Sequence, residues 1–239
     1  MTYSTNNTRF VYSFTKKLSV NEEQYKVNLQ LLEESISLLS KYFDYRIVTD
    51  QATLDDVKNL ASNINTVDTG DFIFIEDFKT SLISKLGENE ILVDPDILMK
   101  KKPKLHLNAD IIFDHKDSPD SSWYTENLED LKGTMLYSRI IQAGRIPFVP
   151  NIGFFKIPNL KLRSTFLNYY RAYREDILNK GKDNPNQFNL NLGQYLLGIV
   201  LYEGNYSYFN LRSINTGKVY VHLAGPQKYK RLNAIKTII

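Results

Sequence analysis

The chain has 239 residues, of which 42% are hydrophobic, so it can bury one large core or at most two small ones. Its 30 basic and 27 acidic side chains give a formal net charge of +3, which argues against nonspecific nucleic-acid binding as the main activity, because domains with that activity concentrate much more positive charge. The sequence contains no cysteine, which excludes disulfide bonds and thiolate zinc sites and fits a reducing compartment.

Neither end of the sequence carries an apolar segment typical of membrane targeting. Residues 1–9 are polar and lack the apolar core of a signal peptide, and the apolar run at residues 195–202 is too short to span a bilayer. We therefore expect no transmembrane segment and a soluble, cytoplasmic protein. The abundance of Asn, Lys, Ile and Tyr suggests an AT-rich genome, so the cytoplasm would be that of a bacterium or of a virus-infected cell.

In the first half of the chain, apolar runs rich in β-formers alternate with segments of helical periodicity. The predicted strands are residues 10–14, 45–50, 71–75 and a buried strand within 91–98. The predicted helices are residues 21–43, 54–64 and 79–86, the last of which ends before Gly87. Strands that alternate with helices favour an α/β fold whose mainly parallel sheet is covered on both faces.

The second half of the chain is less regular, although it still mixes strands with helices. The predicted strands are residues 109–113, 148–155 and 218–222, and the predicted helices are residues 162–180 and 192–202. No internal repeat or low-complexity linker divides the sequence, so we expect one domain over residues 1–239.

Two carboxylates, Asp94 and Asp96, follow the buried strand and are separated by Pro95. In an extended backbone these two side chains project to the same side. An Asp-x-Asp pair taken alone more often marks a turn. Its position directly after a buried strand is what favours a ligand-binding function. Ligands of open α/β sheets bind beyond the carboxyl ends of strands, where a proline is also tolerated. Paired carboxylates there suit Mg²⁺ or Mn²⁺ that carries phosphate groups.

A second group of candidate residues follows the last predicted strand. His222 offers an imidazole, which Mn²⁺ accepts beside carboxylate oxygen. Gly225 permits a close approach of its backbone amide to a phosphate, and Lys228 would neutralise diphosphate charge. The plain alternative is a histidine at a strand end followed by a Gly-Pro turn.

Four short motifs resemble, in their order, those of the GT-A class of nucleotide-sugar glycosyltransferases, most of all the branch that contains glycogenin and the bacterial lipopolysaccharide galactosyltransferases. They are Asp94-Pro95-Asp96, Asn151-Ile152-Gly153, Gly193-Gln194 and the run from His222 to Lys228, within a resemblance that covers about residues 10–229. The resemblance implies a single GT-A-like (Rossmann-like) domain with a smaller antiparallel portion in its second half. It also implies a nucleotide-binding half at about residues 1–100 and a sugar and acceptor half at about 101–239.

The resemblance further implies a role for each matching residue. Asp96 would be the principal metal ligand, Asp94 would bind metal and the donor's ribose, and His222 would complete the protein's share of the metal shell. The other implied positions are Ser13, Thr15 and Asp50 near the nucleotide base and ribose, Lys79 against the donor, Gly225 and Lys228 at the diphosphate, Asn151 and Gly153 in the sugar pocket, and Gln194 close to the anomeric carbon. Asp96 and Gln194 would be the catalytic residues.

The implied activity is transfer of a sugar from a nucleotide diphosphate donor, with Mn²⁺ or Mg²⁺ as the cofactor and a UDP-sugar as the expected donor. The acceptor stays open among a glycan, a protein, a lipid-linked saccharide and a nucleic acid. Gly193 stands where the family usually has an acidic residue, so one sugar-binding carboxylate is missing from the motif. It also removes one position for a catalytic base, which favours retention, with Glu203 and Asp183 as remaining candidate bases.

Two alternatives stay open beside this interpretation. The first is a catalytically inactive binding or structural protein that keeps the glycosyltransferase scaffold, which the glycine at position 193 favours. The second is a sugar-phosphate nucleotidyltransferase, which uses a related sheet. Those enzymes generally carry a glycine-rich loop after the first strand, and residues 13–17 contain no glycine.

A further acidic cluster with a histidine follows the predicted strand at 109–113. It comprises Asp110, Asp114, His115 and Asp117. The cluster is a rival metal site, but we interpret it as the solvated rim of a loop.

Overall fold

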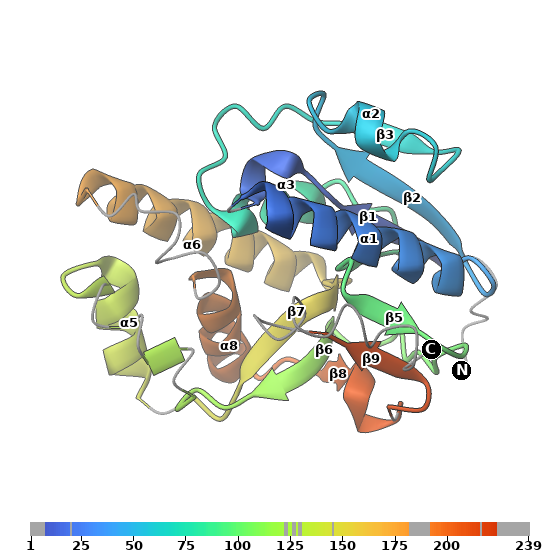
Figure 1. The fold of residues 1–239 in the computed structure, drawn as a ribbon. Coiled ribbons are helices and arrows are strands. Elements are labelled where there is room, and N and C mark those ends of the chain that lie inside the picture. The colour runs from blue at the N-terminus through green and yellow to red at the C-terminus, as the bar shows by residue number, and fades with distance from the viewer. Residues whose placement is uncertain are drawn as a thin grey trace.

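The computed structural model of the chain describes residues 8–223 except 20, 122–123, 126–127, 129–130, 145, 182–191 and 216. Its strands are β1 (Arg9–Ser13), β2 (Asp44–Thr49), β3 (Ile64–Thr66), β4 (Glu90–Val93), β5 (Ile97–Met99), β6 (Ile111–Asp117), β7 (Val149–Lys156), β8 (Tyr208–Asn210) and β9 (Tyr220–His222) (Figure 1). Its α-helices are α1 (Glu22–Leu39), α2 (Leu54–Val57), α3 (Ile75–Ile83), α5 (Met135–Ala143), α6 (Leu160–Asn179) and α8 (Leu192–Gly204).

Seven of the described strands form one sheet in the order β3-β2-β1-β4-β7-β6-β8. The strands β3, β2, β1 and β4 are parallel to one another, whereas β7 is antiparallel to both β4 and β6. A separate antiparallel pair consists of β5 and β9. The predicted fold class is therefore confirmed: an α/β fold with a mainly parallel central sheet and a smaller antiparallel portion.

The direction of β7 brings distant motifs to one edge of the sheet. The parallel strands β1, β2 and β4 end at the same edge, and the antiparallel β7 begins there. The backbone amide of Asp94, directly after β4, donates to the carbonyl oxygen of Gly153 in β7 at 2.7 Å. The carboxylates that follow β4 consequently lie beside the first residues of β7.

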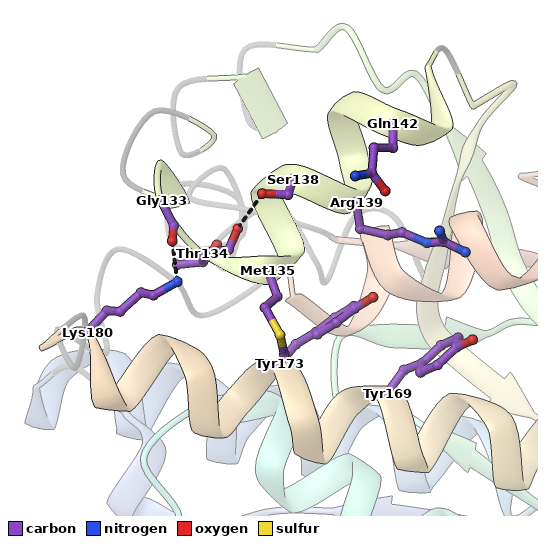
Figure 2. Close-up of a pocket in the computed structure, with 9 residues that line it drawn as sticks. All are labelled: Gly133, Thr134, Met135, Ser138, Arg139, Gln142, Tyr169, Tyr173 and Lys180. Carbon is purple, nitrogen blue, oxygen red and sulfur yellow. Dashed lines mark hydrogen bonds between the residues drawn. The ribbon is translucent and has the colours of Figure 1, made fainter.

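An open pocket of about 440 Å³ lies between helices α5 and α6. Figure 2 shows the side chain of Met135, from α5, pointing toward the ring of Tyr173, from α6. The Tyr173 ring stacks on that of Tyr169 with 5.9 Å between centroids. The residues that line the pocket are Gly133, Thr134, Met135, Ser138, Arg139, Gln142, Tyr169, Tyr173 and Lys180.

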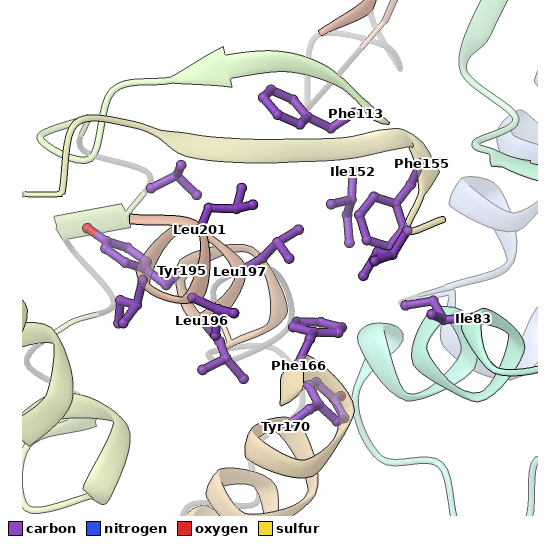
Figure 3. Close-up of a cluster of buried hydrophobic side chains, with 14 of the residues drawn as sticks. Ile83, Phe113, Ile152, Phe155, Phe166, Tyr170, Tyr195, Leu196, Leu197 and Leu201 are labelled. Carbon is purple, nitrogen blue, oxygen red and sulfur yellow. The ribbon is translucent and has the colours of Figure 1, made fainter. Parts of the chain in front are cut away.

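Apolar side chains of the strands bury alternately on the two faces of the sheet. Leu92 of β4 faces one apolar cluster, whereas its neighbours Ile91 and Val93 face the other. Helices α3, α6 and α8 cover the first cluster, and Figure 3 shows Phe166 of α6 and Leu197 of α8 on the side of β7 where Ile152 and Phe155 project. Helix α1 covers the second cluster. Burial on both faces explains why the strands of the first half are almost continuously apolar.

The predicted strand at residues 71–75 is wrong. The chain enters α3 there, and the helix begins at Ile75, four residues before the predicted start. The Asp77 carboxylate accepts the amides of Ile73 and Phe74 at 2.7 and 2.9 Å, which satisfies donors that a helix N-terminus leaves unpaired. A short apolar run does not distinguish a strand from the buried approach to a helix.

The predicted helix at residues 54–64 is also shorter than expected. Only Leu54–Val57 is helical, and Ile64–Thr66 forms strand β3 beside β2. The sequence interpretation missed α5 and β8 entirely. None of the described helices combines the length and the apolar character needed to span a membrane.

Candidate functional site

The loop after β4 is held on both sides by backbone hydrogen bonds. The amide of Ile97 donates to the carbonyl oxygen of Asp94, and the amide of Leu223 donates to that of Asp96 at 2.9 Å. The register of β5 with β9 then places Ile97 opposite His222. The last residues of β9 therefore lie directly beside the Asp-x-Asp pair.

Asp94 is paired with a lysine from α3. The ammonium of Lys79 lies 2.8 Å from Asp94 Oδ2, and the two side chains are 10% and 23% exposed. Burial raises the pKa of Asp94, and the Asp96 carboxylate raises it further, while Lys79 opposes the shift. Burial lowers the pKa of Lys79, but Asp94 and Glu76 outweigh this effect and keep the ammonium charged. Lys79 therefore brings a buried ammonium group to the sheet edge, where the Asp94 carboxylate pairs with it.

His222 lies between two carboxylates. Its Nε2 is 3.4 Å from Asp96 Oδ1, and its Nδ1 is 2.6 Å from Asp114 Oδ2. Burial lowers the pKa of the imidazole, but Asp96 and Asp114 outweigh this effect and raise it to about 10. Asp96 and His222, distant in sequence, thus share one charged site, and a proton on Nε2 faces Asp96.

The expectation that Asp114 belongs to a solvated rim is wrong. β6 extends to Asp117, so Asp114 lies within a strand, and its side chain is fully buried. Burial raises the pKa of Asp114, but hydrogen bonds from His115 and His222 outweigh this and hold it well below the usual range. Tyr220 also donates to this carboxylate, at 2.6 Å. Asp114 is therefore a buried, ionised carboxylate that holds His115, His222 and Tyr220 in place.

The ligand atoms of Asp114, His115 and His222 lie within 4.8 Å of one another, so these three residues form a group that could hold a metal ion. Both imidazole Nδ1 atoms contact the same oxygen of Asp114, at 2.5 and 2.6 Å. A metal ion bound at that oxygen would have to displace these two hydrogen bonds. In the described arrangement Asp114 orients the two rings.

A continuous line of polar contacts leads from Asp114 toward α8. His115 Nε2 lies 3.0 Å from Asp117 Oδ1, and burial, which lowers the pKa of His115, is outweighed by Asp114 and Asp117, which raise it. The hydroxyl of Tyr124 lies 2.9 Å from Asp117 Oδ2 and 2.7 Å from Gln194 Oε1. The two residues expected to be catalytic, Asp96 and Gln194, are therefore the ends of one polar network.

The first residues of β7 join the same network. The amide of Asn151 donates to Asp117 Oδ2 at 3.2 Å, and its oxygen accepts the backbone amide of Gly153 at 3.0 Å. A Cβ atom on Gly153 would lie only 2.8 Å from Cε1 of His222. Gly153 is therefore required for the packing of the imidazole, which is a local reason for the Asn-x-Gly motif.

The predicted nucleotide residues lie at the ends of β1 and β2. Thr15 donates to Asp50 Oδ2 at 2.5 Å, and Ser13 pairs with Val48 across the two strands. Burial raises the pKa of Asp50, but hydrogen bonds from Thr15 and Thr53 outweigh this and lower it. The carboxylate of Asp50 is therefore ionised at neutral pH. β1 lies between β2 and β4, so Thr15 and Asp50 share the sheet edge with Asp94.

Of the four remaining candidates, only Glu203 lies among the described residues. Gly225, Lys228 and Asp183 lie outside the described residues. Glu203 pairs with Arg139 at 2.6 Å in the last turn of α8. It is nine residues from Gln194, which corresponds to about 14 Å along a helix, so we do not retain it as a candidate base.

Two residues of the site were not singled out from the sequence. Tyr124 joins Asp117 to Gln194, and its position follows an irregular segment that has no motif. Glu76 lies three residues before Lys79 on α3 and is fully buried. The spacing of Glu76 and Lys79 is a helical i, i+3 pair, a signal that the wrong strand prediction at 71–75 concealed.

No protein-family model matches the sequence. No curated protein matches it either. Among solved structures, the fold is similar to that of CTP:phosphocholine cytidylyltransferase (LicC) from Streptococcus pneumoniae, with a TM-score of 0.50 and 9% sequence identity over 97% of this chain and 99% of that chain. At this identity the similarity shows a shared fold.

A second similarity is to the apo form of the glycosyltransferase GlyE from Streptococcus pneumoniae TIGR4, with a TM-score of 0.44 and 13% identity. It covers 98% of this chain and 50% of that chain, so this chain spans half the length of GlyE. The expected membership of the glycogenin branch stays a prediction.

Proposed function

We propose that this protein is a metal-dependent glycosyltransferase that moves a sugar from a nucleotide diphosphate donor to an acceptor hydroxyl. One observation carries the proposal. Residues from four separate parts of the chain, at positions 94–96, 151, 194 and 222, meet at the carboxyl edge of a mainly parallel sheet. Ligands of open α/β sheets bind at this edge. A UDP-sugar is the proposed donor.

The residues that would hold the metal are Asp94, Asp96 and His222. Carboxylate oxygens with one imidazole form a donor set that Mn²⁺ accepts, and Mg²⁺ also binds carboxylates. The contact of His222 Nδ1 with Asp114 turns Nε2 toward Asp96, an arrangement common for histidines that bind metals. A metal ion bound at Nε2 would displace the proton that this nitrogen carries in the metal-free site. When bound, the divalent ion would stabilise the negative charge of the departing diphosphate as a Lewis acid.

Cationic and hydrogen-bonding residues nearby would bind the nucleotide. Lys79 brings an ammonium to Asp94, where it would neutralise charge on the donor. The proposed contacts with base and ribose come from Ser13, Thr15 and Asp50, of which Asp50 is ionised and accepts hydrogen bonds. Gly225 and Lys228 are the proposed residues at the diphosphate.

The side-chain amides of Asn151 and Gln194 would orient the sugar. Amides both donate to and accept from hydroxyl groups, so they fix a sugar without adding charge. If the acceptor attacks from the face that the diphosphate leaves, no protein nucleophile is needed, and configuration at the anomeric carbon is retained.

A nucleotidyltransferase is the second candidate, because the similarity to the cytidylyltransferase extends over nearly all of both chains. The absence of glycine from residues 13–17 argues against it. Release of pyrophosphate from a nucleoside triphosphate in the presence of a sugar phosphate would establish this activity. An inactive scaffold is the third candidate, and even slow hydrolysis of a sugar donor would exclude it.

Isothermal calorimetry with Mn²⁺ and a panel of UDP- and GDP-sugars tests the proposal. We expect the wild type to bind a nucleotide sugar only when Mn²⁺ is present. Asp96→Ala should abolish this binding, because the remaining ligands cannot match the charge of the metal. Asp44→Ala, which removes an exposed carboxylate at the start of β2, is the control and should bind like the wild type. Failure of the wild type to bind any nucleotide with Mn²⁺ would overturn the proposal.

A further inference from the structure

Glu76, in the first turn of α3, is a buried carboxylate whose oxygens accept no hydrogen bond from the described residues. Its side chain is 0% exposed, and neither oxygen has a hydrogen-bond partner among the residues that the structure describes. The adjacent Asp77, in contrast, accepts hydrogen bonds from two backbone amides, from Tyr170 and from Arg174. Asp77 therefore caps the start of α3, whereas the carboxylate of Glu76 takes no part in this capping.

A buried carboxylate without hydrogen-bond partners is unfavourable in its ionised form. It is stabilised either by taking up a proton or by accepting hydrogen bonds from a bound ligand. Burial raises the pKa of Glu76 to about 7, with Lys79 opposing the shift and Asp94 adding to it. The group therefore ionises readily near neutral pH. Hydrogen bonds from a ligand to the ionised carboxylate would lower this pKa and offset the free-energy cost of burying the charge.

The carboxylate of Glu76 lies directly against the backbone of Gly193. A Cβ atom built on Gly193 would be 3.0 Å from Glu76 Oε2 and 3.3 Å from the carboxyl carbon. Gly193 is the second residue of α8 and directly precedes Gln194. A carboxylate brought from α3 thus occupies the space that the side chain of an acidic residue at position 193 would enter.

The surroundings of Glu76 are those of the proposed donor site. Lys79, one helical turn further along α3, contacts Asp94 at 2.8 Å. On the other side, Gln194 contacts Tyr124 at 2.7 Å, and the charge of Glu76 also acts on Tyr124. Glu76 therefore has Lys79, which contacts the proposed metal ligand Asp94, on one side and Gly193, which precedes Gln194, on the other.

We propose that Glu76 supplies the carboxylate that accepts hydrogen bonds from hydroxyl groups of the transferred sugar, in place of an acidic side chain at position 193. This inference rests on the proposed glycosyltransferase function. A carboxylate with two unused oxygens accepts two neighbouring hydroxyls, and hydrogen bonds to an ionised acceptor are the stronger kind. Gly193, which has no side chain, leaves room for the carboxylate of Glu76.

The test compares the sugar-dependent part of donor affinity between variants. Calorimetry with Mn²⁺ measures the dissociation constants of UDP and of UDP-glucose, UDP-galactose and UDP-N-acetylglucosamine. The ratio of the UDP constant to that of the preferred donor is the sugar advantage. In Glu76→Gln we expect unchanged UDP affinity and a loss of about tenfold or more in the sugar advantage, since a hydrogen bond to a charged group is replaced. Glu33→Gln, on the exposed face of α1, is the control.

A second experiment moves the carboxylate from position 76 to position 193, which distinguishes loss of sugar binding from loss of folding. Gly193→Asp alone should lower the melting temperature and the sugar advantage, because its Cβ would crowd Glu76 and add a like charge. In the double variant Glu76→Ala/Gly193→Asp, the carboxylate returns from α8, and the sugar advantage should recover relative to Glu76→Ala.

The outcomes separate this inference from the proposed function. If the wild type binds UDP with Mn²⁺ and the sugar advantage is the same in Glu76→Gln, the inference is wrong and the proposed function stands. If the double variant recovers nothing relative to Glu76→Ala, the carboxylate at this place does not bind the sugar. If the wild type binds no nucleotide, the proposed function is wrong, and the inference is wrong with it.

Discussion

At the scale of single residues, His222 owes its position to three different neighbours. Asp114 contacts its Nδ1 atom, Asp96 faces its Nε2 atom, and Gly153 leaves room for the ring. Two of these neighbours are among the motif residues found in the sequence. The third, Asp114, was assigned to solvent because its burial depends on Tyr220 and His222, which approach it only in the folded chain.

The first prediction concerns Asp114 as a positioning residue. Asp114→Asn keeps the shape of the side chain but removes the anion that both imidazole rings contact, so the Nε2 atom of His222 is no longer held toward Asp96. We expect the affinity for Mn²⁺ to fall about 10- to 100-fold, the usual effect of losing such an orienting partner. Calorimetric titration of Mn²⁺ measures this change.

The control for this variant is Asp44→Asn, the same chemical change at an exposed residue of β2. It should bind Mn²⁺ like the wild type. Wild-type Mn²⁺ affinity in Asp114→Asn, with the fold retained by circular dichroism, would show that Asp114 does not orient the imidazole.

At the scale of the elements, the sequence predicted the central strands better than the helices and connections between them. β1, β2, β4 and β7 lie close to their predicted positions, because strands buried on both faces are recognisable as apolar runs between turns. The start of α3 was not recognisable, because residues 72–75 are also an apolar run, and the capping contact of Asp77 is visible only in the structure. This error concealed the relation between Glu76 and Lys79.

An ion pair across the sheet gives a prediction about stability. Glu90, the first residue of β4, accepts two hydrogen bonds of 2.8 Å from Arg46 of β2, and both side chains are mostly buried. The hydrogen bond from Arg46 lowers the pKa of Glu90 below its unfolded value. The unfolded chain then binds more protons between the two pKa values, so this stabilisation is present above the unfolded pKa and is lost as the pH falls through the folded one.

Glu90→Gln should therefore lower the free energy of unfolding by about 1–3 kcal/mol at pH 7, the size of a hydrogen bond to a charged group. The difference from the wild type should shrink toward zero as the pH falls below the folded pKa, where Glu90 is protonated in both states. Urea unfolding at a series of pH values measures this dependence. A difference that is the same at every pH would contradict the assigned role of the ion pair.

At the scale of the whole molecule, the order of motifs along the chain predicted which residues would approach one another. Asp96 and His222 are brought together because β9 pairs with β5, and Asn151 joins them because β7 runs antiparallel to β4. The sequence offered no means to foresee the contacts that connect these motifs, through Asp117 and Tyr124, because Tyr124 belongs to no recognised sequence motif. The same holds for the approach of Glu76 to Gly193.

The fold alone does not decide the chemistry, because nucleotide-dependent enzymes of more than one kind share this type of sheet. The proposed function depends most on the metal site formed by Asp94, Asp96 and His222. Anomalous diffraction from crystals soaked with MnCl₂ and UDP tests it most directly. We predict a manganese peak within coordination distance of Asp96 and His222, with Asp94 beside it. A peak held by Asp114 and His115 with Asp96 outside its coordination shell, or no manganese peak at this edge of the sheet, would contradict the account.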